Sequence, residues 1–237
     1  MYISPFLIYL KKIYLQIKGK EIKGLSSSVI YGPNAAGKTN IIGAMDVLRA
    51  IVLRGNIRNS EEKSSPNPAA AALELIPNNN EMESKPVCFE IEFYEEDGED
   101  HKFKIHYELE VDLGTFLEEE YQRKILAEVL EVNGERVFER TQDLKIENLK
   151  VIKDYLSDIT EQNAESVNEI AKNSLNQEEL FLTNGFKLIF SPKFTKLMVD
   201  WFTNKFMVIY RADSMQLIKR FADPKKKAIY VEKTTDD

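Results

Sequence analysis

The residues with the clearest chemistry form one short run, GPNAAGKT at positions 32–39. This run matches the phosphate-binding loop pattern G-x-x-x-x-G-K-[ST] at every fixed position. Gly32 and Gly37 allow backbone conformations in which successive N–H groups point at phosphate oxygens. Lys38 can reach the β- and γ-phosphates of a nucleotide, and the Thr39 hydroxyl is a magnesium ligand in such loops. The run therefore predicts a site for a nucleoside triphosphate and its magnesium ion.

The motif needs a strand before it and a helix after it, and the neighbouring residues predict both. Residues 26–31 (SSSVIY) predict a short apolar strand that leads into the loop. After the loop, apolar side chains recur at three- and four-residue steps, which is typical of one helix face. The helix would begin at Gly37 and end near Gly55, so that its N-terminal dipole lies under the phosphates. The apolar positions are Ile41, Ala44, Met45, Leu48, Ile51 and Val52.

This context argues against a chance match to the loop pattern. Residues at their usual frequencies would produce the pattern in roughly one chain in a hundred of this length. Here the pattern also stands between a predicted strand and a predicted helix. Upstream, residues 2–22 are rich in Ile, Leu, Tyr and Phe and predict one or two further strands.

The longer run VIYGPNAAGKTNIIGAMDVL resembles the ABC-like ATPases of the RecF, SMC and overcoming-lysogenization (OLD) type. Asn34 fits the loop asparagine of that group, Thr39 stands where serine is commoner, and Asn40 fits the start of the helix. Within this group the chain is most similar to bacterial and archaeal AAA-type ATP-binding proteins, many of which act in phage defence or abortive infection. The similarity extends more weakly through residues 86–112 and 132–140.

This resemblance implies an α/β fold: a P-loop NTPase, as the N-terminal half of an ABC-like head, with an antiparallel β-lobe and a helical insertion. It implies Mg-ATP as the bound cofactor and Thr39 as the residue that holds the metal. The nucleotide-binding residues that it implies are Gly32, Pro33, Asn34, Ala35, Ala36, Gly37, Lys38, Thr39 and Asn40.

The residue composition and hydrophobic pattern of the remaining chain change several times, which suggests a division into segments. Alternating apolar and polar residues over 87–93 and 103–111 predict antiparallel strands with one wet face. Asn133-Gly134 predicts a tight hairpin turn. We expect strands, loop and helix over 1–54, a flexible linker over 55–86, an antiparallel β-lobe over 87–140, a mostly helical region over 141–205, and a strand with a charged tail over 206–237.

A complete ATPase of this kind also needs a buried strand that ends in Asp-Glu, and the sequence lacks a good candidate. The apolar run 206–210 is followed by Arg211, and residues 197–200 (LMVD) lie in a helical pattern. No Ser-Gly-Gly-Gln-like segment is present. We therefore expect that the chain ends before the catalytic half, and the sequence identifies no catalytic residues. We also expect that ATP is hydrolysed only by a complete or dimeric assembly.

Several other side chains are weaker candidates for chemistry. The acids on the predicted wet face of the lobe are interpreted as solvating charges rather than catalytic pairs, and the two histidines face opposite sides and make a poor metal pair. Gln177 is a weak candidate for a magnesium-sensing glutamine. Trp201 and Phe202 favour core packing. The acids are Glu90, Glu92, Glu108 and Glu110, and the histidines are His101 and His106. We interpret Arg49, Arg54 and Arg58 as charges on a helix surface and not as a nucleic-acid interface.

Composition and charge exclude some classes of protein. The chain has 237 residues, is 43% hydrophobic and has a net charge of −7, so a folded core is expected. The one cysteine, Cys88, excludes an intrachain disulfide framework. No run approaches the roughly 18 apolar residues that span a bilayer, so we expect a cytoplasmic protein without a membrane partner. The first 59 residues carry nine basic and two acidic groups, which fits either a solvated surface with uneven charges or polyanion binding there.

These observations leave three functional hypotheses open. The first is an Mg-ATP-binding ATPase in DNA-linked or phage-defence work, in which ATP-bound heads associate as a homodimer and a nucleic acid or an effector nuclease is a partner. The second is a truncated nucleotide sensor that binds ATP or ADP without turnover. The third is a small P-loop kinase, but the acidic, β-rich middle of the chain offers no arginine-rich lid.

Overall fold

In the computed structural model, the described residues are 8–17, 20–33, 37–59, 75–76, 85–97, 101–115, 123–157, 164–173 and 175–206. They form a two-stranded sheet, a five-stranded sheet and a set of helices. Both sheets are antiparallel. Most of the expected linker over 55–86, and nearly all of the strand and tail expected over 206–237, lie outside the described residues.

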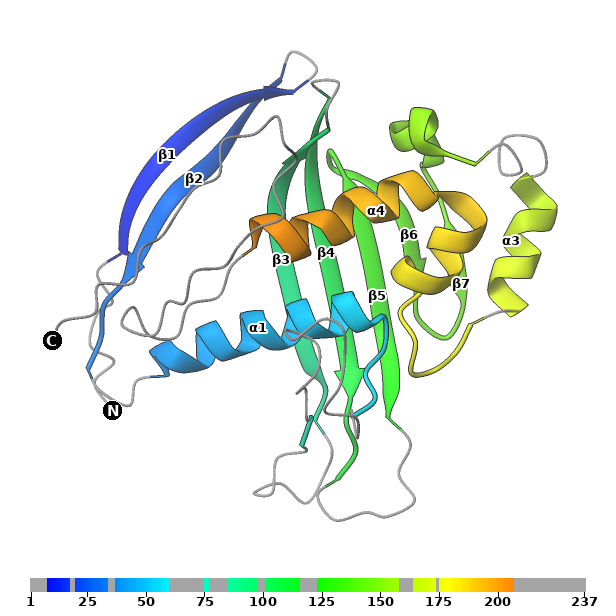
Figure 1. The fold of residues 1–237 in the computed structure, drawn as a ribbon, viewed down its shortest axis with the longest axis horizontal. Helices are drawn as coiled ribbons and strands as arrows, with labels where there is room; N and C mark the ends of the chain where they lie inside the picture. The colour runs from blue at the N-terminus through cyan, green and yellow to red at the C-terminus, as the bar shows by residue number, and fades with distance from the viewer. Residues whose placement is uncertain are drawn as a thin grey trace, which may run out of the picture.

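The two-stranded sheet leads into the phosphate-binding loop. Strands β1 (Ile8–Ile17) and β2 (Lys20–Ile30) pair antiparallel, with Ile8 opposite Ile30 at one end and Ile17 opposite Lys20 at the other. This confirms strands upstream of the loop. The strand expected over residues 26–31 is the end of the longer β2, which runs into Gly32 (Figure 1).

Helix α1 (Lys38–Arg54) follows the loop, as predicted. It begins after Gly37 (φ 84°) and ends at Gly55 (φ 73°), whose N–H donates to the Ile51 carbonyl at 2.8 Å. Both caps use the left-handed backbone region that glycine adopts without strain. The predicted apolar face is buried only in the second half of the helix, at Leu48, Ile51 and Val52.

The five-stranded sheet runs in the order β3 (Val87–Glu96), β4 (Lys102–Asp112), β5 (Lys124–Val132), β6 (Glu135–Arg140), β7 (Leu144–Ile146). Alternate residues of β4 are buried and partly exposed, which confirms the prediction of strands with one wet face. The β5–β6 turn has positive φ at Asn133 (56°) and Gly134 (81°), as an Asn-Gly hairpin turn requires.

The prediction of a mostly helical region from 141 onward is wrong at its start. Residues 144–146 form β7, whose Ile146 pairs with Phe138 of β6. The turn before β7 is closed by Asp143, whose carboxylate accepts from the Leu144 N–H at 2.9 Å. The apolar steps Ile146, Leu149 and Ile152 imitate a helix, but the sheet edge takes the first of them. Helical structure follows as η1 (Leu149–Tyr155) and α3 (Ala164–Asn173).

The C-terminal described segment packs against the face of the five-stranded sheet that carries the buried side chains. It consists of the π-helix η2 (Leu182–Phe190), α4 (Pro192–Asp200) and the π-helix η3 (Trp201–Lys205). Ser191 caps α4 by accepting from the Phe194 N–H at 3.1 Å, and the helical pattern expected at residues 197–200 is confirmed. Figure 1 shows α1 and α4 crossing the same face of β3, β4 and β5. The fully buried aromatics here are Tyr107, Phe138, Phe181, Phe186, Phe190, Phe194 and Phe202.

Two further predictions concern this layer. Phe202 is fully buried and Trp201 stacks on Phe93 with ring centroids 3.9 Å apart, so the expected core role of this pair is confirmed. Asp200 ends a helix and not a strand, as expected from its sequence pattern. Among the described helices, none has the length and apolar character to cross a membrane.

Candidate nucleotide-binding site

The loop that carries the motif lies between the end of β2 and the start of α1. Gly32, Gly37, Lys38 and Thr39 are described, together with Pro33 and Asn40, whereas Asn34, Ala35 and Ala36 lie outside the described residues. The predicted order of strand, loop and helix is therefore present. It brings the motif's lysine and threonine to the first turn of the helix.

The Lys38 side chain folds back onto its own loop. Its Nζ donates to the Gly32 carbonyl at 2.7 Å and to the Pro33 carbonyl at 2.6 Å. Both acceptors are neutral carbonyl groups, so among the described residues the ammonium charge is held by backbone dipoles. Phosphate oxygens carry full negative charge and form stronger, charge-assisted bonds with lysine. The lysine is thus held beside the place where a phosphate would compete for it.

The first turn of α1 is left open to an anion. The cap residue Gly37 provides no side-chain hydrogen bond, and the turn contains no acidic residue. Asn40 donates from its N–H to the Gly37 carbonyl at 3.0 Å, while the N–H groups of the first helical residues have no partner within the helix. Thr39 and Asn40 are exposed. These groups fit a phosphate chain on the helix N-terminus, with the Thr39 hydroxyl free for magnesium.

A comparison with protein families decides the class of this site. A family model described as "AAA domain, putative AbiEii toxin, Type IV TA system" matches residues 27–191, from the end of β2 to the cap of α4. The chain belongs to this AAA family. Membership implies a P-loop NTPase fold that binds a nucleotide, usually with Mg²⁺. Comparisons with curated proteins and with solved structures find no match.

The surface around the loop of this AAA-family chain is apolar. Ile30 is 42% exposed and Tyr31 59% exposed where β2 runs into the loop. On the first turns of α1, Ile41 is 46% exposed and Met45 40% exposed. These two residues belong to the apolar stripe that is buried further along the helix, so this end of α1 presents a face that resembles core.

Gln177 lies at the wrong end of α1 to sense magnesium in this AAA-family chain. Its carbonyl accepts from the Ile125 N–H at 2.8 Å, and the neighbouring Glu178 carbonyl accepts from the Ile57 N–H at 3.0 Å. Ile57 follows the C-terminus of α1, whereas the loop precedes its N-terminus. A 17-residue helix is about 25 Å long. The weak suggestion of a role for Gln177 is therefore wrong for the described arrangement.

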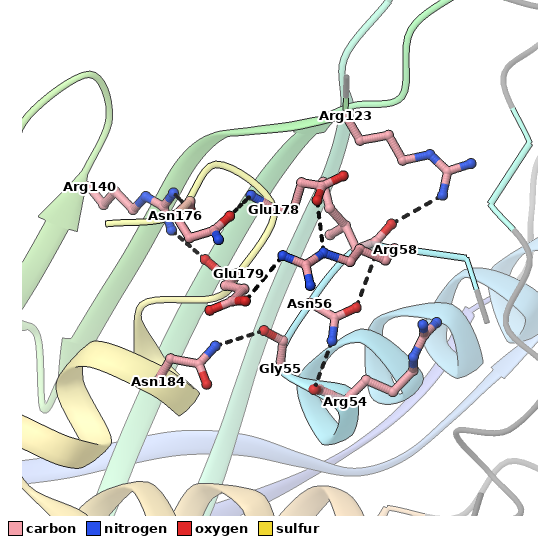
Figure 2. A network of polar contacts seen from close by, with 11 residues as sticks. Arg54, Gly55, Asn56, Arg58, Arg123, Arg140, Asn176, Glu178, Glu179 and Asn184 are labelled. Carbon is pink, nitrogen blue, oxygen red and sulfur yellow. Dashed lines mark hydrogen bonds and ion pairs between the residues drawn. The ribbon is translucent and has the colours of Figure 1, made fainter. Parts of the chain in front are cut away.

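Two of the three arginines in and just after α1, Arg49 and Arg58, contact distant parts of the chain. Figure 2 shows the Arg58 side chain pointing toward Glu178 and Glu179. Arg58 pairs with Glu178 at 2.8 Å and Glu179 at 3.1 Å, and these carboxylates raise the pKa of Arg58. Burial, with the charge of Arg123 nearby, lowers the pKa of Arg54. The third arginine, Arg49, donates to the Phe202 carbonyl at 2.8 Å. The contacts of Arg49 and Arg58 favour a packing role, whereas Arg54 Nη1 is buried without a hydrogen-bond partner among the described residues.

A buried polar network under the sheet was not predicted from the sequence. Glu128 is fully buried and accepts from Tyr107 Oη at 3.0 Å and from the N–H groups of Phe181 (2.6 Å) and Leu182 (2.9 Å). Arg140 lies 3.7 Å from Glu128. Burial raises the pKa of Glu128, with Arg140 acting against it, and burial raises the pKa of Tyr107 well above its usual value. The network joins the sheet to the start of η2.

Proposed function

We propose that this AAA-family chain binds Mg-ATP through residues 32–40 as a head of the RecF/OLD type, and that hydrolysis takes place in a complete or dimeric assembly. The observation that carries the proposal is the pairing of Lys38 with the Gly32 and Pro33 carbonyls beside an open helix N-terminus. ATP binding would exchange these two neutral acceptors for β- and γ-phosphate oxygens. The Thr39 hydroxyl would then hold the magnesium ion that bridges the phosphates.

The need for an assembly rests on what surrounds the loop. No described strand ends in Asp-Glu, the pair that would hold magnesium and polarise water. The apolar side chains of Ile41 and Met45 also remain exposed next to the loop. A second ATP-bound head would cover this face and bring further residues to the γ-phosphate. The role in phage defence is supported by the sequence resemblance of residues 29–48.

The test is ATP binding by the full chain, measured by calorimetry with and without Mg²⁺. The Lys38→Ala variant is expected to lose at least tenfold in affinity because the charge that contacts the phosphates is removed. Lys193→Ala is the matched control, since Lys193 is an exposed lysine in the first turn of α4. Thr39→Ala is expected to lose the magnesium dependence selectively. Unchanged affinity in the Lys38 variant would show that the site is elsewhere.

The absence of an Asp-Glu strand among the described residues favours a second candidate, a nucleotide sensor that does not turn ATP over. Steady-state release of phosphate separates the two. Magnesium-dependent turnover that rises with the square of protein concentration and disappears in Lys38→Ala supports the dimeric ATPase. Tight ATP binding without turnover at any protein concentration supports the sensor. A nucleic-acid partner for the basic N-terminal part predicts DNA affinity that falls steeply with salt.

A further inference from the structure

The outer face of the five-stranded sheet carries a histidine between two glutamates. Strand alternation directs Ile105 and Tyr107 of β4 to the helices, so His106 and Glu108 lie on the opposite face. In β3, Glu90 is the register partner of Glu108 and lies diagonally across from His106. The three side chains therefore project from one small area of the sheet, remote in the chain from the phosphate-binding loop.

The distances among these three side chains fit one shared metal ion. His106 Nε2 lies 3.2 Å from Glu90 Oε1 and 3.3 Å from Glu108 Oε1. The ligand atoms all lie within 4.8 Å of one another. Tetrahedral zinc with bonds of 2.0–2.1 Å places its ligand atoms about 3.4 Å apart. One nitrogen and two carboxylate oxygens at these separations can bind the same ion once the exposed glutamate side chains rotate toward it.

The state of His106 Nε2 is the second observation. This nitrogen is screened from solvent and makes no hydrogen bond, although two carboxylate oxygens lie close to it. The oxygens therefore flank the direction of an N–H instead of lying along it. Ligands of a tetrahedral ion have this arrangement, because each bond from the metal diverges from the others. A metal ion between the three side chains would give this nitrogen the directed bond that neither carboxylate supplies.

The opposite ring nitrogen has the support that metal-binding histidines usually have. His106 Nδ1 faces Glu131 Oε2 at 3.4 Å, from the adjacent strand β5. Arg136 fixes that carboxylate through two bonds to Glu131 Oε1, at 3.1 and 3.3 Å. A carboxylate behind a histidine sets its tautomer and leaves the other nitrogen as a metal ligand. Nε2 is therefore the ring nitrogen that remains to bind an ion held between Glu90 and Glu108.

The charges of this face also favour a bound cation. Glu90 and Glu108 stand directly opposite each other, a like-charge pair that destabilises two antiparallel strands. Two neighbouring acids already have basic partners: Glu92 pairs with Lys104 at 2.5 Å and Glu131 pairs with Arg136. The negative charges of Glu90 and Glu108 therefore stay concentrated around His106 Nε2.

We propose that Glu90, His106 and Glu108 form a zinc-binding site on the β-lobe, independent of the nucleotide site. A histidine nitrogen with carboxylate oxygens suits Zn²⁺ and related transition metals better than Mg²⁺ or Ca²⁺, which prefer oxygen alone. The three residues leave a fourth position of the ion open to solvent or to an external ligand. The ion would join β3 to β4 and replace their electrostatic repulsion by bonds.

The test is a zinc titration of the tag-free full chain after treatment with EDTA, read by competition with a chromophoric chelator. One equivalent of Zn²⁺ is expected to bind, and Glu90→Gln and His106→Ala are each expected to weaken it at least tenfold. Glu90 has a 73% exposed side chain, so its variant tests the site without threatening the fold. Glu131→Gln is expected to weaken zinc binding roughly 10–100-fold through the orientation of His106.

Three controls make the result specific. His101→Ala changes the chain's other histidine, Cys88→Ser changes its one thiol, and Lys38→Ala changes the nucleotide site; all three are expected to bind zinc as the wild type does. Visible bands of tetrahedral Co²⁺ in the wild type, lost in Glu90→Gln, would confirm the geometry. No stoichiometric zinc binding, equal affinity in the Glu90 and His106 variants, or loss in His101→Ala or Cys88→Ser would overturn the proposal.

Discussion

The two halves of α1 differ in how far the rest of the described protein covers them. In the C-terminal half, Leu48, Ile51 and Val52 are at most 4% exposed under the β-lobe and its aromatic layer. In the N-terminal half, Ile41 and Met45 remain 40% exposed or more. The same apolar stripe therefore serves as core at one end and as free surface at the end that carries the phosphate-binding loop. The C-terminal half thus contributes to the core, and the N-terminal half carries the motif at which we propose nucleotide binding.

The comparison predicts that truncating an apolar side chain lowers the free energy of unfolding much more in the buried layer than at the exposed end of α1. Phe186→Ala empties a fully buried site in the aromatic layer and is expected to lower the free energy of unfolding by about 3–5 kcal/mol. Ile41→Ala, on the exposed end of α1, is expected to change it by less than about 0.5 kcal/mol. Urea denaturation followed by circular dichroism measures both. Similar losses in the two variants would mean that the exposed end is covered in solution.

The buried Glu128 network predicts the next largest effect. Glu128→Ala removes the acceptor for Tyr107 and for the first N–H groups of η2, and leaves Arg140 buried beside an empty site. Loss of one partner from a buried ion pair costs about 3–5 kcal/mol. The control is Glu135→Ala, at the exposed start of β6. A cost for Glu128→Ala no larger than that of the control would show that the network is not essential for the packing of η2.

Two glycines test the same contrast at the level of one methyl group. A Cβ at Gly185 would lie 2.6 Å from the Phe181 ring, so Gly185→Ala is expected to destabilise the protein by about 1–3 kcal/mol. A Cβ at Gly43, inside α1, would meet no neighbour, and Gly43→Ala is expected to stabilise by about 0.5–1 kcal/mol. Thermal denaturation of both variants measures these two changes in stability. Stabilisation by Gly185→Ala would contradict the described packing of η2.

Tyr107 predicts the smallest effect, a dependence of stability on alkaline pH. Its pKa is raised well above 10.0 by burial, so above about pH 10 the unfolded chain releases this proton and the folded chain keeps it. The folded state then binds more protons, and stability falls by up to about 1.4 kcal/mol per pH unit. Denaturant titrations between pH 8 and about 11 should show a shallower decline for Tyr107→Phe. Parallel declines would mean that Tyr107 ionises normally.

The parts of the fold that were predictable from sequence depend on local patterns. Glycine positions and helical periodicity located α1, and strict alternation located β3 and β4. β7 was missed because its pairing with β6 competes with a helical repeat that is also present in the sequence. The packing of η2 depends on Gly185, where the absence of a side chain makes room for Phe181. Such contacts between distant residues leave no periodic pattern.

The two candidate sites also differ in whether the sequence alone reveals their residues. The nucleotide site is a contiguous motif, so its residues could be named from the sequence. The Glu90–His106–Glu108 cluster depends on strand register, which sets a histidine of β4 diagonal to a glutamate of β3. Alternation alone placed these acids on the wet face and suggested only solvation. Glu128 was equally hidden, because one buried carboxylate in an apolar strand is recognised only from its partners.

The most direct test of nucleotide binding at the open end of α1 is amide hydrogen exchange of the full chain with and without Mg-ATP. We expect exchange to slow in residues 32–45, because the loop and the first turns of α1 acquire phosphate partners. Residues 181–190 of the buried layer are expected to exchange equally slowly in both states. Protection by ATP that appears elsewhere in the chain and spares residues 32–45, or no protection at saturating ATP, would contradict the assignment of the site.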